Sequence, residues 1–320
     1  IIDTGYGYWW SSIAGSTADR YGLYYNGSSL NTGSNYRYYG RYIRCVNDNS
    51  TSSKLYMQDQ TQSSLATLMP NVGDEVTLYD SRDEKSYTVA KLADGNYWMA
   101  ANLNLAGGTA LSADDTDVDA SYISSFTTSN NLTKSDNTIV LPASSQSFNT
   151  NNYSYVYNSS STDCSSSTGC YGYYSWDAAT LGSGRSISVA NTNASYSICP
   201  KGWKLPTTYD GSGSAAEATD FRALMIALGG SNSVQTYNSS TTPTGATMYG
   251  KLVAAPYNFL LTGYYNGDSF YNGGSRGYYW SATSSSSTYA RRLYFYSDFV
   301  YSASTDLRNY GFSVRCVFGD

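Results

Sequence analysis

Three aspartates at alternating positions come closer to a metal-binding motif than any other pattern in this chain. Asp115, Asp117 and Asp119 place a carboxylate at every second residue, and hard cations such as Ca²⁺ favour clustered oxygen ligands. The continuation of a calcium loop fails, because Ala120 stands where the turn glycine belongs and Phe126 where the closing glutamate belongs. We therefore expect a solvated acidic loop, with weak calcium binding as the alternative and no other cofactor.

The absence of histidine limits the catalytic chemistry that the chain can perform. It excludes imidazole general bases, catalytic triads and imidazole metal sites. Glycoside hydrolysis would need two carboxyl groups that face one cleft, and no spacing singles out two of the acids. We therefore expect a protein that is not an enzyme, since a hydrolase or an oxidase would need such an acid pair or a free reactive cysteine. The acids considered are Asp74, Glu75, Asp80, Asp83, Glu84, Asp177, Glu217 and Asp298.

The five cysteines indicate an oxidising compartment, and hence an extracellular or cell-surface location. Cys164 and Cys170 flank a short Ser/Thr/Gly loop and can close locally. Cys199 and Cys316 then remain for a long-range bridge. Cys45 is left over, and an odd cysteine in a secreted chain suggests an intermolecular or inter-repeat bridge. A zinc site is a weaker alternative, because the chain lacks histidine and paired CxxC spacing.

Two tyrosine-rich segments, 264–280 and 289–301, form a second candidate site. Alternating tyrosines on strands build cross-strand ladders, and tyrosine is also enriched at protein interfaces. Aromatic faces can in addition stack on sugar rings. We expect a ladder in the first place, a subunit contact in the second and a glycan contact in the third. The residues predicted for an interface or a glycan contact are Tyr278, Tyr279, Tyr294 and Tyr296.

Charge and hydropathy exclude two classes of partner. Only 13% of the residues are charged, the net charge is −5, and basic residues do not cluster. The chain therefore lacks the electrostatic pattern of a nucleic-acid-binding protein. The apolar runs are too short to span a bilayer, so we expect no membrane insertion within this segment.

The two ends of the chain carry the same sequence pattern. Residues 8–46 run parallel to residues 278–317. Matching positions lie 270 apart at Trp10 and 271 apart at Cys45, so one copy contains a single-residue insertion. A repeat of this length corresponds to a whole domain and is much longer than a solenoid unit.

The repeat predicts the domain organisation. Residues 1–46 are expected to be a C-terminal fragment of a preceding repeat, or a segment that docks on a neighbour. Residues 47–54 are polar and read as a linker, and residues 55–320 form one complete repeat domain. Cys45 would then form its bridge across the junction between copies.

The pattern of strands and helices predicts an α+β fold that is rich in strands. From residue 75, alternating hydrophobic residues predict a β-meander with a tight hairpin turn at Asp94–Gly95. The clearest helix is expected at residues 215–228, where Ser214 and Glu217 have the spacing of a capping box. Long loops rich in Ser, Thr, Asn and Gly connect these elements.

Four segments in this order resemble the Fibrobacter succinogenes major paralogous domain, a secreted module similar to C-type lectins. The resemblance implies a C-type-lectin-like domain, preceded here by a partial copy of its own C-terminal β region. It implies that Cys199 and Cys316 pair, and that Trp98, Trp176, Trp203 and Trp280 belong to the core. The motifs by which lectins hold calcium and sugar are missing. The segments are YTVAKLADGNYWMAANLNL at 87–105, CYGYYSWDAAT at 170–180, SICPKGWKLPT at 197–207, and GYYWSAT and GFSVRCV at 277–283 and 311–317.

The functional expectation is a non-enzymatic extracellular module that builds a cell-surface fibre, stalk or tandem array. Its partners would be copies of itself or adjacent repeats. The alternative is a surface adhesin that binds glycans through its aromatic loops.

Overall fold

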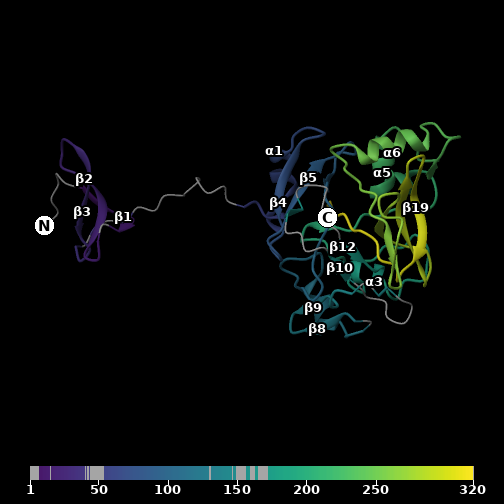
Figure 1. Cartoon of the computed structure of the whole chain (residues 1–320), viewed down its shortest axis with the longest axis horizontal. Coiled ribbons are helices and arrows are strands. Elements are labelled where there is room, and N and C mark those ends of the chain that lie inside the picture. Colours follow the sequence, from purple (N-terminus) through teal and green to yellow (C-terminus); the bar gives the residue numbers. More distant parts are fainter. Residues whose placement is uncertain are drawn as a thin grey trace. The chain divides into compact units, whose positions relative to one another are not determined.

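The structure is a computed structural model, and it divides the chain into two compact units, Ile1–Ser53 and Lys54–Asp320 (Figure 1). The described residues are 7–14, 16–39, 41, 43, 54–129, 131–145, 147–148, 156–158, 163–164 and 172–319.

The first unit contains a three-stranded antiparallel sheet in the order β1 (Gly7–Ala14), β2 (Asp19–Tyr25) and β3 (Leu30–Tyr36). The β2–β3 turn forms because the Asn26 side chain accepts a hydrogen bond of 2.8 Å from the main-chain N–H of Ser29. Gly27 supplies the positive φ of 86° that this turn requires. Local turn chemistry therefore determines the meander.

The second unit contains a four-stranded antiparallel sheet in the order β14–β19–β18–β17. Its third strand in this order, β18, pairs with both long neighbours, and helices α5 and α6 pack against β19 (Figure 1). All eight residues of β17 are buried. The elements are β14 (Thr236–Tyr237), β17 (Gly277–Ser284), β18 (Tyr289–Tyr296), β19 (Phe299–Leu307), α5 (Asp220–Ala227) and α6 (Gly245–Val253).

A six-stranded sheet contains the predicted β-meander. The hairpin turn at Asp94–Gly95 is confirmed, since Gly95 has a φ of 83° and the Leu92 N–H donates to the Asn96 carbonyl oxygen. The strands are β4 (Glu75–Tyr79), β5 (Ser86–Lys91), β6 (Tyr97–Met99), β11 (Asp163–Cys164), β13 (Trp203–Lys204) and β20 (Val317–Phe318). Because β20 lies between β6 and β13, it joins the strands of the meander to β13.

The remaining elements are short, and the predicted β-dominated α+β class is confirmed. They are η1 (Met57–Asp59), α1 (Gln62–Leu68), α2 (Ala120–Ser125), α3 (Trp176–Ala179), α4 (Ser214–Glu217), β7 (Ala110–Leu111), β8 (Thr133–Ser135), β9 (Thr138–Val140), β10 (Val156–Asn158), β12 (Gly172–Tyr174), β15 (Tyr264–Asn266) and β16 (Ser269–Tyr271).

The helix predicted at 215–228 is divided into α4 and α5, and this part of the prediction is wrong. The Asp220 carboxylate accepts hydrogen bonds of 2.8 Å from the main-chain N–H and the hydroxyl of Thr207. The Phe221 N–H donates to the Thr207 carbonyl oxygen. These tertiary bonds replace the intrahelical bonds that a continuous helix would have made.

The β17–β19 sheet lies between two hydrophobic cores. Tyr278 and Trp280 contribute to the larger core, whereas Tyr279 contributes to the core that also holds α5 and α6. The four tryptophans implied as core residues are each at most 1% exposed, so that expectation is confirmed. Each indole N–H also has an acceptor, as buried tryptophan requires.

The two meanders have the same strand register. Tyr8 pairs with Tyr24 in the first unit, as Tyr278 pairs with Tyr294 in the second. In both units a register shift follows at the same place, after Trp10 and after Trp280. The sequence repeat is therefore also a structural repeat of a whole three-stranded sheet.

The single-residue insertion becomes a β-bulge in β19. In the first unit Leu23 faces one residue, Thr32. In the second unit the register shifts around the equivalent Leu293, which faces Ser302 and Ala303 together. The bulged Ser302 donates its N–H to Gln235 O at 3.1 Å and accepts from the Thr208 hydroxyl at 2.8 Å.

Candidate functional site

The predicted calcium carboxylates each have a different hydrogen-bonding role. Asp115 accepts from the hydroxyl of Thr116 at 2.6 Å, and Asp119 accepts from the hydroxyl of Tyr196 at 2.8 Å. Asp117 accepts from the hydroxyl of Ser197 at 2.6 Å. Within the ranges that the structure describes, no three acidic or cysteine side chains converge on a point that could hold a metal ion.

The main chain of this acidic segment pairs with the segment around Cys199. The Asp117 N–H donates to the Cys199 carbonyl oxygen at 2.9 Å, and the Ser197 N–H donates to the Asp117 carbonyl oxygen at 3.0 Å. The Lys201 N–H donates to the Asp115 carbonyl oxygen at 3.0 Å. The acidic segment is therefore anchored beside a cysteine, and is not the freely solvated loop that the sequence suggested.

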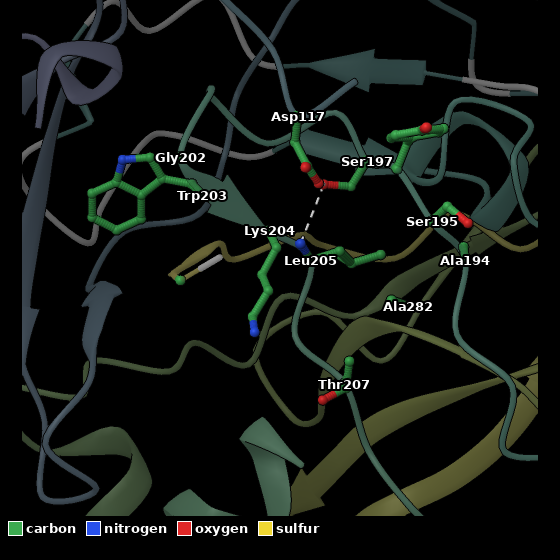
Figure 2. A pocket seen from close by; sticks show the side chains of 12 residues that line it. Asp117, Ala194, Ser195, Ser197, Gly202, Trp203, Lys204, Leu205, Thr207 and Ala282 are labelled. Atoms are coloured by element: carbon green, nitrogen blue, oxygen red, sulfur yellow. Dashed lines mark hydrogen bonds between the residues drawn. The ribbon is translucent and has the colours of Figure 1, made fainter. Parts of the chain in front are cut away.

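A cavity of about 390 Å³ opens beside Asp117 (Figure 2). The hydroxyl groups of Ser195, Ser197 and Thr207 contribute polar lining, and the Lys204 side chain lies between Asp117 and Thr207. Ala194, Leu205, Ala282 and Trp203 contribute apolar lining. Among the described residues that line the cavity, Asp117 is the only acid, so the lining does not contain an acid pair of the glycosidase kind.

Burial raises the pKa of the Asp117 carboxyl group to about 6. The hydrogen bond from Ser197 and the positive charge of Lys204 act in the opposite direction and only partly compensate. The Lys204 ammonium lies 3.9 Å from an oxygen of Asp220, which makes a loose ion pair. The cavity therefore presents a carboxyl group that changes its charge near neutral pH, together with one ammonium group and three hydroxyls.

We expect the Asp117→Asn variant to gain stability relative to the wild type as the pH rises. A carboxyl group whose pKa is raised in the folded state binds its proton more tightly there than in the unfolded chain. The wild-type unit should therefore lose up to about 3 kcal/mol between pH 4 and pH 7, and the variant should not show this loss. Urea unfolding across this pH range measures the difference; parallel pH profiles of the two proteins would contradict the assignment.

The disulfide joins Cys199 to Cys316, the long-range pair expected within the complete domain. Both cysteines are fully buried, and the bridge ties the segment before β13 to the segment before β20. Cys45 and Cys170 lie outside the described residues, as does the side chain of Cys164. Their predicted bridges therefore stay predictions.

Two of the four predicted contact tyrosines are buried, which corrects the expectation for them. Tyr278 is 3% exposed and Tyr279 is fully buried, because both faces of β17 are covered. Tyr294 and Tyr296 on β18 are half-buried and can still contact a partner. The cross-strand ladder is the interpretation that the structure supports, since the rings of Tyr278 and Tyr294 lie 5.1 Å apart.

The guanidinium group of an arginine packs against the rings of this ladder. The Arg292 guanidinium lies 4.8 Å from the ring centre of Tyr278, 4.6 Å from that of Tyr294 and 5.3 Å from that of Phe312. It also pairs with Asp306 at 2.7 Å. The aromatic cluster thus packs against a partly buried cation–carboxylate pair.

A second cavity, of about 380 Å³, has an aromatic lining. Tyr157, Tyr173, Tyr265 and Phe270 contribute rings, and Tyr173 is fixed by a hydrogen bond of 2.6 Å to the Thr262 carbonyl oxygen. Phe270 is 48% exposed. Sequence reasoning missed this site because β10, β12 and the β15–β16 hairpin are far apart in the chain, although the aromatic density around residues 264–271 was a signal.

The sheet of the first unit exposes the side chains that its counterpart buries. Leu23, Tyr25 and Leu30 are 37%, 42% and 65% exposed, whereas their counterparts Leu293, Phe295 and Val300 are fully buried. Tyr8 is 37% exposed, against 3% for Tyr278. Within its own unit, the first sheet therefore exposes apolar side chains at positions that the second sheet buries.

Comparison with protein families matches residues 93–317 to the Fibrobacter succinogenes major domain. The chain belongs to this family. The resemblance seen in the four sequence segments is confirmed, and the family match includes the aromatic cavity, all of the residues that line the Asp117 cavity except Gly319, and both bridged cysteines. The match to the Fibrobacter succinogenes major domain ends within β20, an interior strand of the six-stranded sheet.

Neither the curated proteins nor the solved structures gave a match to the chain. The helices of the described part of the chain are all too short or too polar to cross a membrane.

Proposed function

We propose that this chain is a non-enzymatic, extracellular structural module that works in a tandem array, fibre or stalk. One observation carries the proposal: β1–β3 repeats the register of β17–β19, and it exposes within its own unit the apolar side chains whose counterparts are buried in the second unit. The sheet therefore serves as the C-terminal sheet of an adjacent copy.

The uncovered sheet has a thermodynamic reason to dock. A three-stranded sheet is about the smallest sheet that can be stable by itself, and contiguous exposed apolar surface marks interaction sites. Burial of such surface contributes about 25 cal/mol per Å². The counterparts of these side chains are fully buried in the second unit, which supports burial of the first sheet on a body of the same fold.

An extracellular location agrees with the disulfide and with the composition. Disulfides persist in oxidising compartments, and the Cys199–Cys316 bridge ties together the ends of the module's second half. Cys45 matches Cys316 in the sequence repeat. Within an array, Cys45 would bridge to the counterpart of Cys199 in the adjacent copy and lock the junction.

Electron microscopy of native secreted material without reducing agent tests the proposal. Fibres or strings with an axial repeat that matches one module are expected. Mass spectrometry of the same material should find Cys45 in a disulfide with a peptide equivalent to the Cys199 peptide. Dispersed single modules in which Cys45 carries a free thiol would overturn the proposal.

The aromatic cavity favours glycan binding as a second candidate function. Three tyrosines and Phe270 surround about 380 Å³, and aromatic rings offer flat faces with polar tips. The volume lies within the range of small-ligand pockets. An adhesin would use this cavity on each repeat of the array to contact surface glycans.

We expect Phe270→Ala to weaken glycan binding at least tenfold, because a stacking ring and part of the cavity wall are lost. Tyr271→Ala is the matched control, since Tyr271 follows on the same strand, is 43% exposed and stacks on Tyr264 outside the cavity. A glycan array followed by titration calorimetry measures both variants. Equal losses, or no binding by the wild type, would remove the adhesin candidate.

A further inference from the structure

The two sheets have the same register but differ at the positions that fit a sheet to its module. These differences decide which copy of the family fold β1–β3 can complete. They concern the bulge, the cation over the ring cluster and the residue beside Asp210.

The bulge of β19 is part of its contact with the module. Through the bulge, Ser302 pairs with Gln235 and Thr208, both of which belong to the body that the sheet covers. In β3 one residue, Thr32, stands in place of the two bulged residues. Seated on this same body, β3 would fall out of register there and leave the Thr208 hydroxyl and the Gln235 carbonyl oxygen without these partners.

The cation over the rings comes from a different place in the chain. Arg41 lies 4.8 Å from the ring centres of Tyr8 and of Trp10. By sequence, Arg41 corresponds to Phe312, whose ring lies 4.3 Å from that of Trp280. The guanidinium of the first sheet thus occupies the position of a phenyl ring in the second.

The residue that supplies the cation in the second unit is also replaced in the first unit, together with its carboxylate partner. Arg292 corresponds to Gly22, and its carboxylate partner Asp306 corresponds to Asn35. A Cβ atom at Gly22 would lie 2.7 Å from the Trp9 carbonyl oxygen and 3.2 Å from the Arg41 guanidinium. Gly22 and Arg41 therefore form a matched pair that excludes the Arg292 arrangement.

A third difference lies at the edge of the contact. Arg291, which is 3% exposed, pairs with Asp210 of the body at 3.1 Å and donates to the Ala303 carbonyl oxygen. Its counterpart in the first sheet is Tyr21. On this body a tyrosine would leave Asp210 without its cation.

We propose that β1–β3 is specific for a related but non-identical copy of the fold and does not fit the body Lys54–Arg276 of its own kind of module. The inference rests on the proposed array. The body of the accepting copy contacts β3 without the need for a bulge. It offers oxygen acceptors to the Arg41 guanidinium and places no carboxylate opposite Tyr21. Adjacent copies are thereby joined in a fixed order, and identical chains do not exchange sheets.

Oxidative refolding of the full chain tests this inference. The cysteine that follows a sheet can pair with Cys199 when that sheet packs on the body, so the disulfide partner of Cys199 identifies the bound sheet. The reduced, unfolded wild-type chain is refolded, and the partner of Cys199 is identified by mass spectrometry. We expect Cys199–Cys316 in nearly all molecules. A chain in which residues 277–312 replace residues 7–41 carries two sheets that fit equally, so Cys199–Cys45 should rise to a share comparable with Cys199–Cys316.

A second variant localises the specificity without a transplant. It combines Tyr21→Arg with one alanine inserted after Thr32, and it should also raise the share of Cys199–Cys45. The control carries Thr17→Arg in the exposed β1–β2 turn, and it should behave as the wild type. Circular dichroism of each refolded protein verifies that the module has formed.

The outcomes separate this inference from the proposed function. A wild-type chain that forms Cys199–Cys45 as readily as the transplant would overturn the inference, even where microscopy shows an array. Absence of Cys199–Cys45 in a folded transplant would overturn it as well, because the two sheets would then not compete for one body. Dispersed native modules would instead count against the array and leave the refolding result unchanged.

Discussion

Replacing Cys199 and Cys316 by alanine is expected to lower the free energy of unfolding of the Lys54–Asp320 unit by about 5 kcal/mol. The bridge closes a loop of 117 positions, and the loss of loop-closure entropy in the unfolded chain grows with loop length, to about 4.7 kcal/mol at 100 residues. Both cysteines are fully buried, so the loss includes a small packing contribution. Urea unfolding under non-reducing conditions measures the change.

The single variants supply the control for this prediction. Cys199→Ala and Cys316→Ala each remove the whole bridge, so each single loss should be close to that of the double variant. Losses that add up from the two single variants would contradict the bridge. They would show that the two side chains stabilise the unit independently, through packing alone.

Replacing Arg315 by alanine should lower the free energy of unfolding by about 3–5 kcal/mol. Arg315 is fully buried, and its guanidinium lies 4.3 Å from the ring centre of Phe259. It donates to the side-chain oxygen of Asn102 at 2.9 Å and to the carbonyl oxygens of Tyr257 and Asn258. Truncation removes this donor from the buried Asn102 side chain and from the two half-buried carbonyl groups. Burial also lowers the pKa of the Arg315 guanidinium.

Lysine should not replace Arg315, because an ammonium group cannot reproduce the planar fork that reaches several acceptors at once. We therefore expect Arg315→Lys to lose most of the stability that Arg315→Ala loses, as measured by thermal unfolding. Lys54→Ala is the control, since it removes an exposed ion pair with Glu84 and should change little. A fully stable Arg315→Lys variant would show that charge alone holds this position.

Local signals in the sequence predicted the parts of the fold that depend on local interactions. The hairpin at Asp94–Gly95 follows from its turn residues, and the core role of the tryptophans follows from the family motifs. The repeat offset predicted that the two meanders correspond. The sequence also showed that one copy has an extra residue, but only the pairing of β18 with β19 located it as the bulge opposite Leu293.

Predictions that depended on exposure were less successful. Tyr278 and Tyr279 are neighbours on β17 and point to opposite faces of the sheet, yet both are buried. The alternation of side chains is the same for a sheet with one covered face and for a sheet between two cores. The aromatic cavity likewise depends on segments that meet only in the folded module.

The sequence by itself determined the family, the α+β class, the correspondence of the two meanders and the pairing expected for Cys199. These properties follow from residue types, spacing and order, which the chain carries with it into any environment. Only the tertiary structure decided which tyrosines are accessible, that Asp117 titrates near neutral pH, and that Gly22 and Arg41 act as a pair. Burial, pKa and steric fit are set by neighbours that lie far away in the sequence, so they exist only once the chain has folded.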